Sequence, residues 1–484
     1  MVLYSIRFWF FFCALLIPYF TVFNKCAKAQ NVWLLLGSLF FYTLVDWRMT
    51  VLLVAAIGIF FFLGLKIDAL CQEQNEKDAS RLTTLAVVLG VSLLVYFKYL
   101  GFFVGQFNKI LMAIGFGSSL PTLRIIMPLG ISFFTFKLMG YVIEVHRETI
   151  RATRDIVKFG LFISFFPTIM SGPIDNPRNF LPQLDGVRTF SWERIGEGFR
   201  RILWGIFLKT CIADLVSGYT DTVLSLYIYH NATTIILGAV LYAFQLYADF
   251  AGYSHMAIGI SQVMGIKVAE NFNRPYFAQN LAEFWRRWHM SLTNWVTQYV
   301  FMPLNIAFRD KGTAGLYLAT LINLVVIGAW HGANWTFVLF GLYHGLLLVA
   351  TMTLDKKRKH FEKQHNLKKN PIWKYSRTSL TFILWCVSLL CFLSPNIHSF
   401  LHIFPHCFNK GFDVPWTEES FQKVPALLFI LVMMFKDYKD EIKLDLHFLH
   451  SSHYWLRLVT TTLLIICILG FGSLDGASFI YYKF

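Results

Sequence analysis

Charged side chains are scarce in this sequence of 484 residues, where Asp, Glu, Lys and Arg make up 15% and hydrophobic residues 56%. A soluble globular domain carries about 25% charged residues, so this composition excludes one. Apolar runs of about 17 to 25 residues, the length that crosses roughly 30 Å of hydrocarbon, recur along the whole chain. Because lipid offers open backbone no hydrogen-bond partner, these runs predict helices. The sequence therefore predicts an all-α, polytopic transmembrane protein.

Motifs of familiar soluble enzymes are also missing. The sequence has no G-x-S-x-G nucleophile elbow, no Walker loop, no G-x-G-x-x-G turn, no H-E-x-x-H pair, and no His followed five positions later by Asp. Its eight cysteines are scattered without a C-x-x-C pair. We therefore expect neither a disulfide framework nor a metal site.

The apolar runs suggest about 11 to 13 crossings of the membrane. Candidate spans are 8–23, 31–46, 49–65, 82–104, 122–145, 156–170, 202–218, 232–263, 315–330, 335–352, 376–395, 423–436 and 456–473. We read 8–23 as a retained span, because no small-residue cleavage pattern follows it. Segment 171–190, rich in Pro, Gly and Asn, is expected to be re-entrant or, alternatively, an ordinary surface loop. The chain 1–484 reads as a single membrane domain, with extra C-terminal spans in 376–484.

The formal charge of +15 indicates orientation and not nucleic-acid binding, because the basic residues fall mainly in short links between apolar runs. The link 353–375 is the most basic, with Lys356, Lys357, Arg358, Lys359, Lys363, Lys368, Lys369 and Lys374. We expect this link to be cytoplasmic and residues 396–422, where only Lys410 is basic, to face outward. The expected location is the cell inner (plasma) membrane, crossed many times.

Segment 280–300 departs from the transmembrane pattern. On a single helix, Leu281, Trp285, Trp288, Leu292 and Trp295 would share one face. Arg286, His289 and Thr293 would lie on another face. We therefore expect an amphipathic helix that lies along the membrane interface or dips into it.

Three histidines occur in unusual surroundings. His331 stands at the break between two apolar runs, in the block 329–335; His344 lies between Tyr343 and Gly345; and His289 lies in the segment just described. An ionisable group within a membrane segment is costly and is a functional candidate by default. A neutral imidazole takes or gives a proton near pH 7. The alternative for each is a histidine hydrogen-bonded between helices.

Several separated blocks resemble the membrane-bound O-acyltransferase family, in particular its bacterial branch of alginate and peptidoglycan O-acetylases and the teichoic acid D-alanylation membrane protein. The resembling blocks are 127–136, 166–184, 249–254, 271–276, 284–292 and 330–335. Together they define a catalytic core over 127–345. The resemblance implies that His331 is catalytic and that His289 is a second functional residue. Lys137 and His255 depart from the family pattern, which more often has Gln and Asp there.

The resemblance also implies the reaction. An acyl group, in our interpretation acetyl, passes from a cytoplasmic donor to hydroxyls of an extracytoplasmic polysaccharide such as alginate or peptidoglycan, or through a periplasmic acetyltransferase partner. The donor is a co-substrate, acetyl-CoA or another acyl thioester, and no cofactor is bound. Besides the donor and acceptor, membrane lipids are the expected partners.

Within this reaction, His331 is the candidate general base toward the acceptor hydroxyl. Asn334, the N–H of Trp335 and His289 are candidate donors to the developing oxyanion. The remaining candidates for substrate binding are Trp330, His344, Asp249, Arg286 and Arg287. The two arginines suit an anionic donor such as coenzyme A, or equally well serve as lipid anchors.

Two alternatives stay open. The first is D-alanyl transfer to teichoic acid. The second is a proton-coupled secondary transporter in which His331 and Asp249 form a proton relay. Transporters often contain inverted repeats, and the sequence has no second copy of block 330–335, which disfavours transport.

Overall fold

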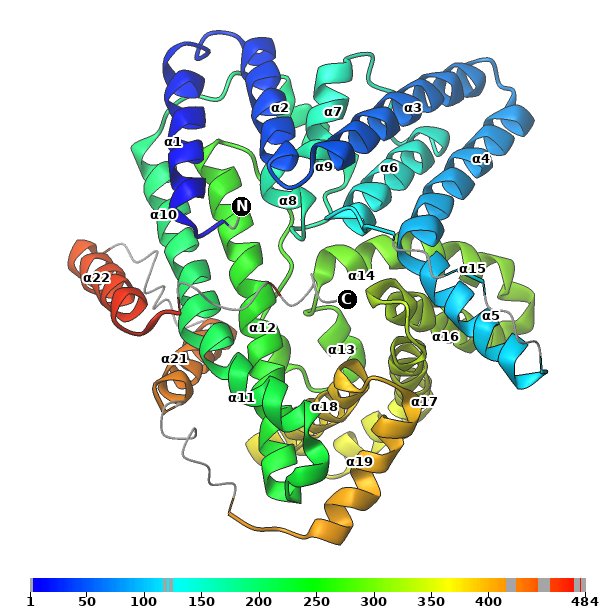
Figure 1. Ribbon diagram of the computed structural model, residues 1–484, viewed down its shortest axis with the longest axis vertical. Coiled ribbons are helices and arrows are strands. Elements are labelled where there is room, and N and C mark those ends of the chain that lie inside the picture. The colour runs from blue at the N-terminus through cyan, green and yellow to red at the C-terminus, as the bar shows by residue number, and fades with distance from the viewer. Residues whose placement is uncertain are drawn as a thin grey trace. The chain divides into compact units, whose positions relative to one another are not determined.

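In a computed structural model of the chain, residues 3–115, 120–121, 125–414, 424–442, 453–473 and 479 are described. Within these ranges the regular secondary structure is entirely helical (Figure 1), which confirms the expected all-α fold. The chain divides into two compact units, one of Met1–Ile202 with Met256–Ala269 and one of Leu203–His255 with Glu270–Phe484.

The first unit contains the N-terminal helices and the start of α10. They are α1 (Ile6–Thr21), α2 (Ala27–Thr43), α3 (Trp47–Gln72), α4 (Glu76–Leu94), the π-helical turn η1 (Val95–Tyr99), α5 (Leu100–Ala113), α6 (Ile131–His146), α7 (Ile156–Ser164), α8 (Phe166–Ile169), α9 (Pro177–Phe180), η2 (Leu181–Leu184) and α10 (Trp192–Phe207). Side-chain caps start several of them: Asp46 accepts from the Arg48 N–H at α3, and Asp155 from the Val157 N–H at α7.

The expected span 156–170 is wrong as a single helix. Helix α7 ends at Ser164, and α8 begins at Phe166 with Pro167 in its first turn. Proline disfavours the α conformation in the residue before it and supplies no N–H, so it begins a helix and does not continue one. Beyond α8, residues 171–176 are non-helical and largely buried. Irregular, buried backbone is therefore present where the sequence predicts a re-entrant segment.

The second unit contains the remainder of the chain. Its helices are η3 (Leu208–Ala213), α11 (Asp214–Ser225), η4 (Tyr227–Tyr229), α12 (Ala232–Val263, to residue 255), η5 (Pro275–Phe277), α13 (Leu281–Trp285), α14 (Met290–Val296), η6 (Thr297–Phe301), α15 (Met302–Ala307), η7 (Arg309–Lys311), α16 (Gly312–His331), α17 (Trp335–Gln364), η8 (Leu367–Lys369), α18 (Pro371–Leu393), α19 (Ile397–Lys410), α21 (Val424–Glu441) and α22 (Tyr454–Phe471).

Eight helical segments in the described residues are long and apolar enough to cross a membrane. They correspond to the expected spans 49–65, 82–104, 202–218, 232–263, 315–330, 335–352, 376–395 and 456–473. Helix α1, with 16 residues, falls short of that length. Of the expected spans 122–145 and 423–436, residues 122–124 and 423 lie outside the described ranges, as do 415–422 of the link expected to face outward.

Helices α16 and α17 form a close antiparallel hairpin (Figure 1). A Cβ atom on Gly328 would lie 2.3 Å from the carbonyl oxygen of Phe337, and one on Gly341 would lie 2.4 Å from that of Leu324. Only glycine permits such close backbone contact. Asn334 begins α17 by accepting a hydrogen bond from the Thr336 N–H. The hairpin thereby fixes His331 at the end of α16 and His344 on α17.

The expected continuous amphipathic helix over 280–300 is also wrong. The segment breaks between α13 and α14, and His289, at the break, has a left-handed backbone conformation with φ 43°. Such a conformation is uncommon outside glycine and requires support from surrounding structure. The break separates the residues that helical periodicity places on common faces.

Candidate active site

The turn that carries His289 is held by a neighbouring, antiparallel stretch of chain at Asn271. The carbonyl oxygen of Asn271 accepts from the Met290 N–H at 2.9 Å. Its side-chain oxygen accepts from the Ser291 hydroxyl at 2.6 Å and the Ser291 N–H at 3.3 Å. Its amide nitrogen donates to the Ser254 hydroxyl at 3.1 Å. Asn271 is fully buried, so these bonds supply the start of α14 with partners that a continuous helix would have provided.

His289 and His331 contact the same indole ring. The ring centroid of Trp330 lies 5.7 Å from that of His289 and 5.1 Å from that of His331. All three side chains are buried, with His289 0% and His331 4% exposed. The structure thus brings the two expected catalytic histidines, from α16 and from the turn before α14, to one aromatic residue.

His331 is enclosed further by rings from two other helices. Phe340 of α17 and Phe392 of α18 lie 6.0 and 5.0 Å from its ring centroid. Phe340 and Phe392 also contact each other at 4.8 Å. This apolar surrounding raises the strength of any electrostatic interaction made inside it. Sequence reasoning assigned no role to Phe392, because nothing local to α18 marks it as a neighbour of residue 331.

His344 lies in the same aromatic cluster. Its ring centroid is 4.6 Å from Phe340, 5.2 Å from Trp285 and 5.7 Å from Trp385. The imidazole is 0% exposed. Phe340 contacts both His344 and His331, so a single ring separates the two histidines.

The charge state of His289 follows from its burial. The turn lies outside the eight long apolar helices, and burial lowers the pKa of its imidazole to about 3. His289 is therefore neutral near pH 7, with one nitrogen protonated and the other an acceptor. A neutral imidazole can donate one hydrogen bond to a ligand without introducing a charge.

Asp249 forms a buried ion pair. Lys209, in the π-helical turn η3, lies 2.8 Å from Asp249 and 2.7 Å from Asp214. All three side chains are less than 5% exposed. Buried charges of opposite sign paired in this way hold helices together, and breaking such a pair is strongly destabilising.

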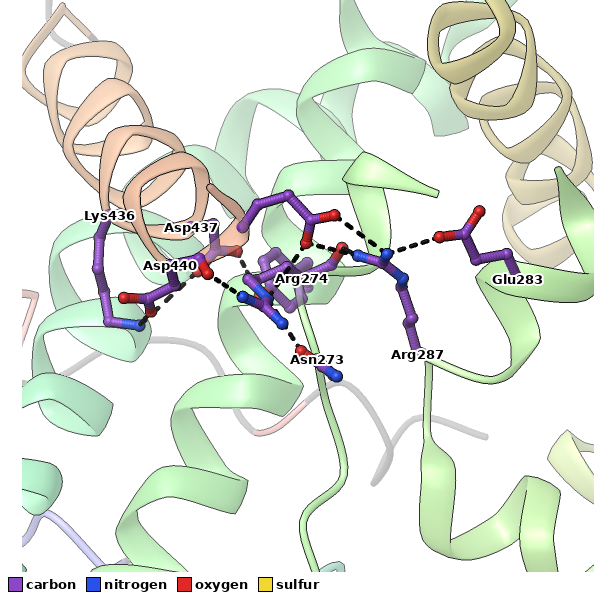
Figure 2. A network of polar contacts seen from close by, with 9 residues as sticks. Asn273, Arg274, Glu283, Arg287, Lys436, Asp437 and Asp440 are labelled. Atoms are coloured by element: carbon purple, nitrogen blue, oxygen red, sulfur yellow. Dashed lines mark hydrogen bonds and ion pairs between the residues drawn. The ribbon is translucent and has the colours of Figure 1, made fainter. Parts of the chain in front are cut away.

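The two expected anion-binding arginines differ in their surroundings. Arg287 forms ion pairs with Glu283 at 2.5 Å and with Glu441 of α21 at 2.8 Å, and it donates to the Arg274 carbonyl oxygen (Figure 2). The pKa of Arg287 is raised, because these carboxylate contacts outweigh the opposing effect of burial. Arg286 is exposed and forms no ion pair within the described residues. Of the two, only Arg286 presents a cation for a ligand.

The Arg287 network continues along α21. Arg274 also contacts Glu441, at 3.4 Å, and Lys436 pairs with Asp440 at 2.9 Å (Figure 2). Asp437 accepts from the Tyr247 hydroxyl at 2.7 Å. Helix α21 is thus attached to the turn that precedes His289. No sequence pattern links these residues, because Glu441 lies 154 positions after Arg287.

Two of the expected oxyanion donors, Asn334 and the N–H of Trp335, lie at the start of α17. The Asn334 amide donates to the Pro395 carbonyl oxygen at 2.9 Å while its oxygen caps the helix. The side chain of Trp335 is 50% exposed. Trp330 and His331 of the same block lie within the buried cluster.

Of the two departures from the family pattern, Lys137 is buried in α6, where its ammonium donates to the Thr168 hydroxyl at 2.8 Å and the Phe162 carbonyl oxygen at 3.3 Å. His255 is partly exposed on α12. Lys137 therefore has polar partners that satisfy it in its own surroundings.

Comparison with known proteins decides the family. The model of the membrane-bound O-acyltransferase family matches residues 8–394. The chain belongs to this family. It is accordingly an acyltransferase and a multi-pass membrane protein. The matched part includes both histidines at Trp330 as well as His344, and it ends before α19, α21 and α22.

Relatives with three different named activities match the chain. A probable alginate O-acetylase AlgI of Pseudomonas putida is 34% identical over 79% of this chain and 76% of the relative. A peptidoglycan O-acetyltransferase of Helicobacter pylori is 33% identical over 70% of this chain and 68% of the relative. A teichoic acid D-alanyltransferase of Bacillus subtilis is 34% identical over 50% of this chain and 63% of the relative.

Proposed function

We propose that this acyltransferase moves an acetyl group from a cytoplasmic acyl thioester, such as acetyl-CoA, to hydroxyl groups of an extracytoplasmic polysaccharide. Delivery is direct or goes through a partner acetyltransferase outside the membrane. The observation that carries the proposal is the placement of His331 and His289 against one buried indole. The proposed location is the inner membrane, with the basic link 353–375 in the cytoplasm.

The proposed chemistry begins with the acceptor hydroxyl, which is a weak nucleophile while it keeps its proton. His331 accepts that proton as the oxygen attacks the thioester carbonyl carbon. The new carbon–oxygen bond forms, the carbon–sulfur bond breaks, and the proton passes from His331 to the leaving thiolate. General-base catalysis of this kind contributes about 10² to 10⁴ in rate.

His289 is assigned to the donor. As a neutral imidazole in a buried aromatic surrounding, it donates one hydrogen bond to the reactive end of the acyl donor without introducing a charge. Arg286, exposed and without an ion pair in the described part of the chain, is proposed to meet the phosphate groups of a coenzyme A donor.

An acetylated polysaccharide is preferred over teichoic acid as the acceptor class. The match to the probable alginate O-acetylase of Pseudomonas putida covers 79% of the chain, whereas that to the D-alanyltransferase of Bacillus subtilis covers 50%. D-alanyl transfer is the second candidate, supported by that shorter match.

The experiment is acyl transfer by purified protein in proteoliposomes. Vesicles receive radiolabelled acetyl-CoA on the side of the link 353–375, and polysaccharide or a soluble sugar mimic on the other side. We expect labelled ester on the acceptor. Transfer of labelled D-alanine and not of acetyl would favour the second candidate, and proton-coupled uptake without any ester would contradict acyl transfer.

A further inference from the structure

Trp285 and His344, two neighbouring residues of the aromatic cluster, carry buried polar groups without hydrogen-bond partners in the described residues. Within the described residues, neither ring nitrogen of His344 forms a hydrogen bond, and the indole N–H of Trp285 forms none. His344 is 0% exposed and Trp285 4% exposed. Their rings meet edge to face, with centroids 5.2 Å apart and an interplanar angle of 87°.

Such groups are expensive to bury. An unsatisfied buried donor or acceptor costs about 1 to 3 kcal/mol, and the great majority of buried polar groups have partners. A buried tryptophan usually directs its N–H to a partner. Two adjacent residues with unsatisfied buried N–H groups therefore indicate a place where a polar group of a ligand binds, and not a site optimised for stability.

The surroundings restrict what that group is. Phe340, Tyr343 and Trp385 contact the His344 ring, and the Tyr343 hydroxyl is already used, donating to the Leu384 carbonyl oxygen at 3.0 Å. The cluster thus offers aromatic walls and, facing each other, the N–H donors of Trp285 and of the neutral imidazole of His344; the indole N–H of Trp385 is a further buried donor without a hydrogen bond in the described residues. A single oxygen acceptor on an otherwise uncharged group fits this set. The carbonyl oxygen of an acyl group has that chemistry.

The position relative to the proposed base supports the same assignment. Phe340 lies 4.6 Å from His344 and 6.0 Å from His331, centroid to centroid. The two donors are therefore one ring away from the residue proposed to activate the hydroxyl. The amide of Asn334, a donor expected from the sequence, already donates to the Pro395 carbonyl oxygen.

We propose that Trp285 and His344 form the subsite that binds the carbonyl oxygen of the acyl donor. This inference rests on the acyl-transfer function proposed above. When the acceptor oxygen attacks, the carbonyl oxygen takes the electron pair of its double bond, and both N–H groups stabilise the resulting charge. The double bond re-forms as the thiolate leaves. Removing one such donor ordinarily costs about 10² to 10³ in kcat.

The test is a comparison of turnover with stability in Trp285→Phe. Phenylalanine keeps the aromatic packing and removes the unsatisfied N–H, so the melting temperature should not fall, because no hydrogen bond is lost. The rate of acetyl transfer from acetyl-CoA should fall about 10²-fold with KM for the donor little changed. Hydrolysis of acetyl-CoA in the absence of acceptor should fall equally, because it passes through the same charged intermediate.

Tyr343→Phe is the matched control. It keeps the ring against His344 and removes only a hydroxyl that already has its partner, so the melting temperature should fall more than in Trp285→Phe, whereas the transfer rate should fall far less than in Trp285→Phe. The pair of variants therefore separates a structural hydrogen bond from a functional one.

A second pair covers the case in which Trp285→Phe does not fold. His344→Gln keeps an N–H donor and should retain more activity than His344→Phe, which has none. A Trp285→Phe rate within threefold of wild type overturns the subsite, as does equal activity of the two His344 variants. Failure of the wild-type protein to transfer acetyl at all would instead contradict the proposed function.

Discussion

Replacing Asn271 by alanine should show whether the turn at His289 is held in place for catalysis. The substitution removes three side-chain hydrogen bonds, from the Ser291 hydroxyl and N–H and to the Ser254 hydroxyl. At about 1 kcal/mol net for each bond, the expected loss of unfolding free energy is about 3 kcal/mol. The left-handed conformation of His289 adds strain of about 1 to 2 kcal/mol that these bonds no longer oppose.

The expected effect on activity is larger than the effect on folding. A displacement of about 1 Å in a reacting group can cost 10² in rate, so we expect kcat of Asn271→Ala to fall at least about tenfold in the fraction that remains folded. The assay is acetyl transfer at matched amounts of monodisperse protein, with thermal unfolding in detergent measured alongside.

Asn273→Ala is the control for this experiment. Asn273 is exposed on the same stretch of chain, and its side chain accepts only from neighbouring Arg274 in the observed contacts. Its loss should change stability by less than about 0.5 kcal/mol. If Asn271→Ala keeps wild-type kcat and melting temperature, the turn does not depend on this amide and the reasoning fails.

Three further predictions follow from the network at α21, from burial and from charge. Glu441→Gln removes the carboxylate that pairs with Arg287 and should cost about 1 to 3 kcal/mol of stability. Asp440→Asn weakens an ion pair with Lys436, which keeps Asp437 at 3.8 Å, and should cost under about 1 kcal/mol; equal melting temperatures of the two variants would contradict a stabilising role for the Arg287–Glu441 pair. Because the folded-state pKa of His289 is about 3, only the unfolded state takes up a proton there as pH falls below about 6.5. The contribution of His289 to the free energy of unfolding is therefore full above about pH 6.5 and declines by about 1.4 kcal/mol per pH unit below it. In melting curves from pH 7 to 4, His289→Gln should remove this part of the loss of stability. In a chain without native cysteines, His360→Cys should react with an impermeant reagent only from the cytoplasmic side; labelling from outside would reverse the topology.

Long apolar helices are the part of the fold that sequence predicts well. The expected span 232–263 coincides with α12 (Ala232–Val263), and those at 315–330 and 335–352 fall within α16 and α17. These boundaries follow from local composition and from the break at Gly332–Asn334, which are visible in the sequence alone.

The failures occur where distant residues determine local structure. Periodicity over 280–300 favours one helix, but Asn271 supplies the hydrogen bonds that let the chain turn at His289 instead. Proline at 167 divides another expected span. Arg287, expected to face an anionic donor, is paired with Glu441 from a region beyond the family match.

The same contrast applies to the site. His331, His289 and Trp330 belong to short blocks that resemble those of the family, and that resemblance points to them. Trp385 and Phe392, which enclose the histidines, lie on an ordinary apolar helix, and only tertiary packing identifies them. The unsatisfied N–H of Trp285 is likewise visible only when burial and hydrogen bonding are known.

The central claim is that His331 is the base of the acyl-transfer reaction. Its most direct test is the transfer rate of purified His331→Ala in proteoliposomes, measured with saturating acetyl-CoA and acceptor and compared with wild type at equal amounts of folded protein. We predict that His331→Ala accumulates normally in the membrane and that its transfer rate is lower than that of wild type by about 10²-fold or more. Retention of more than about a tenth of the wild-type rate would contradict it.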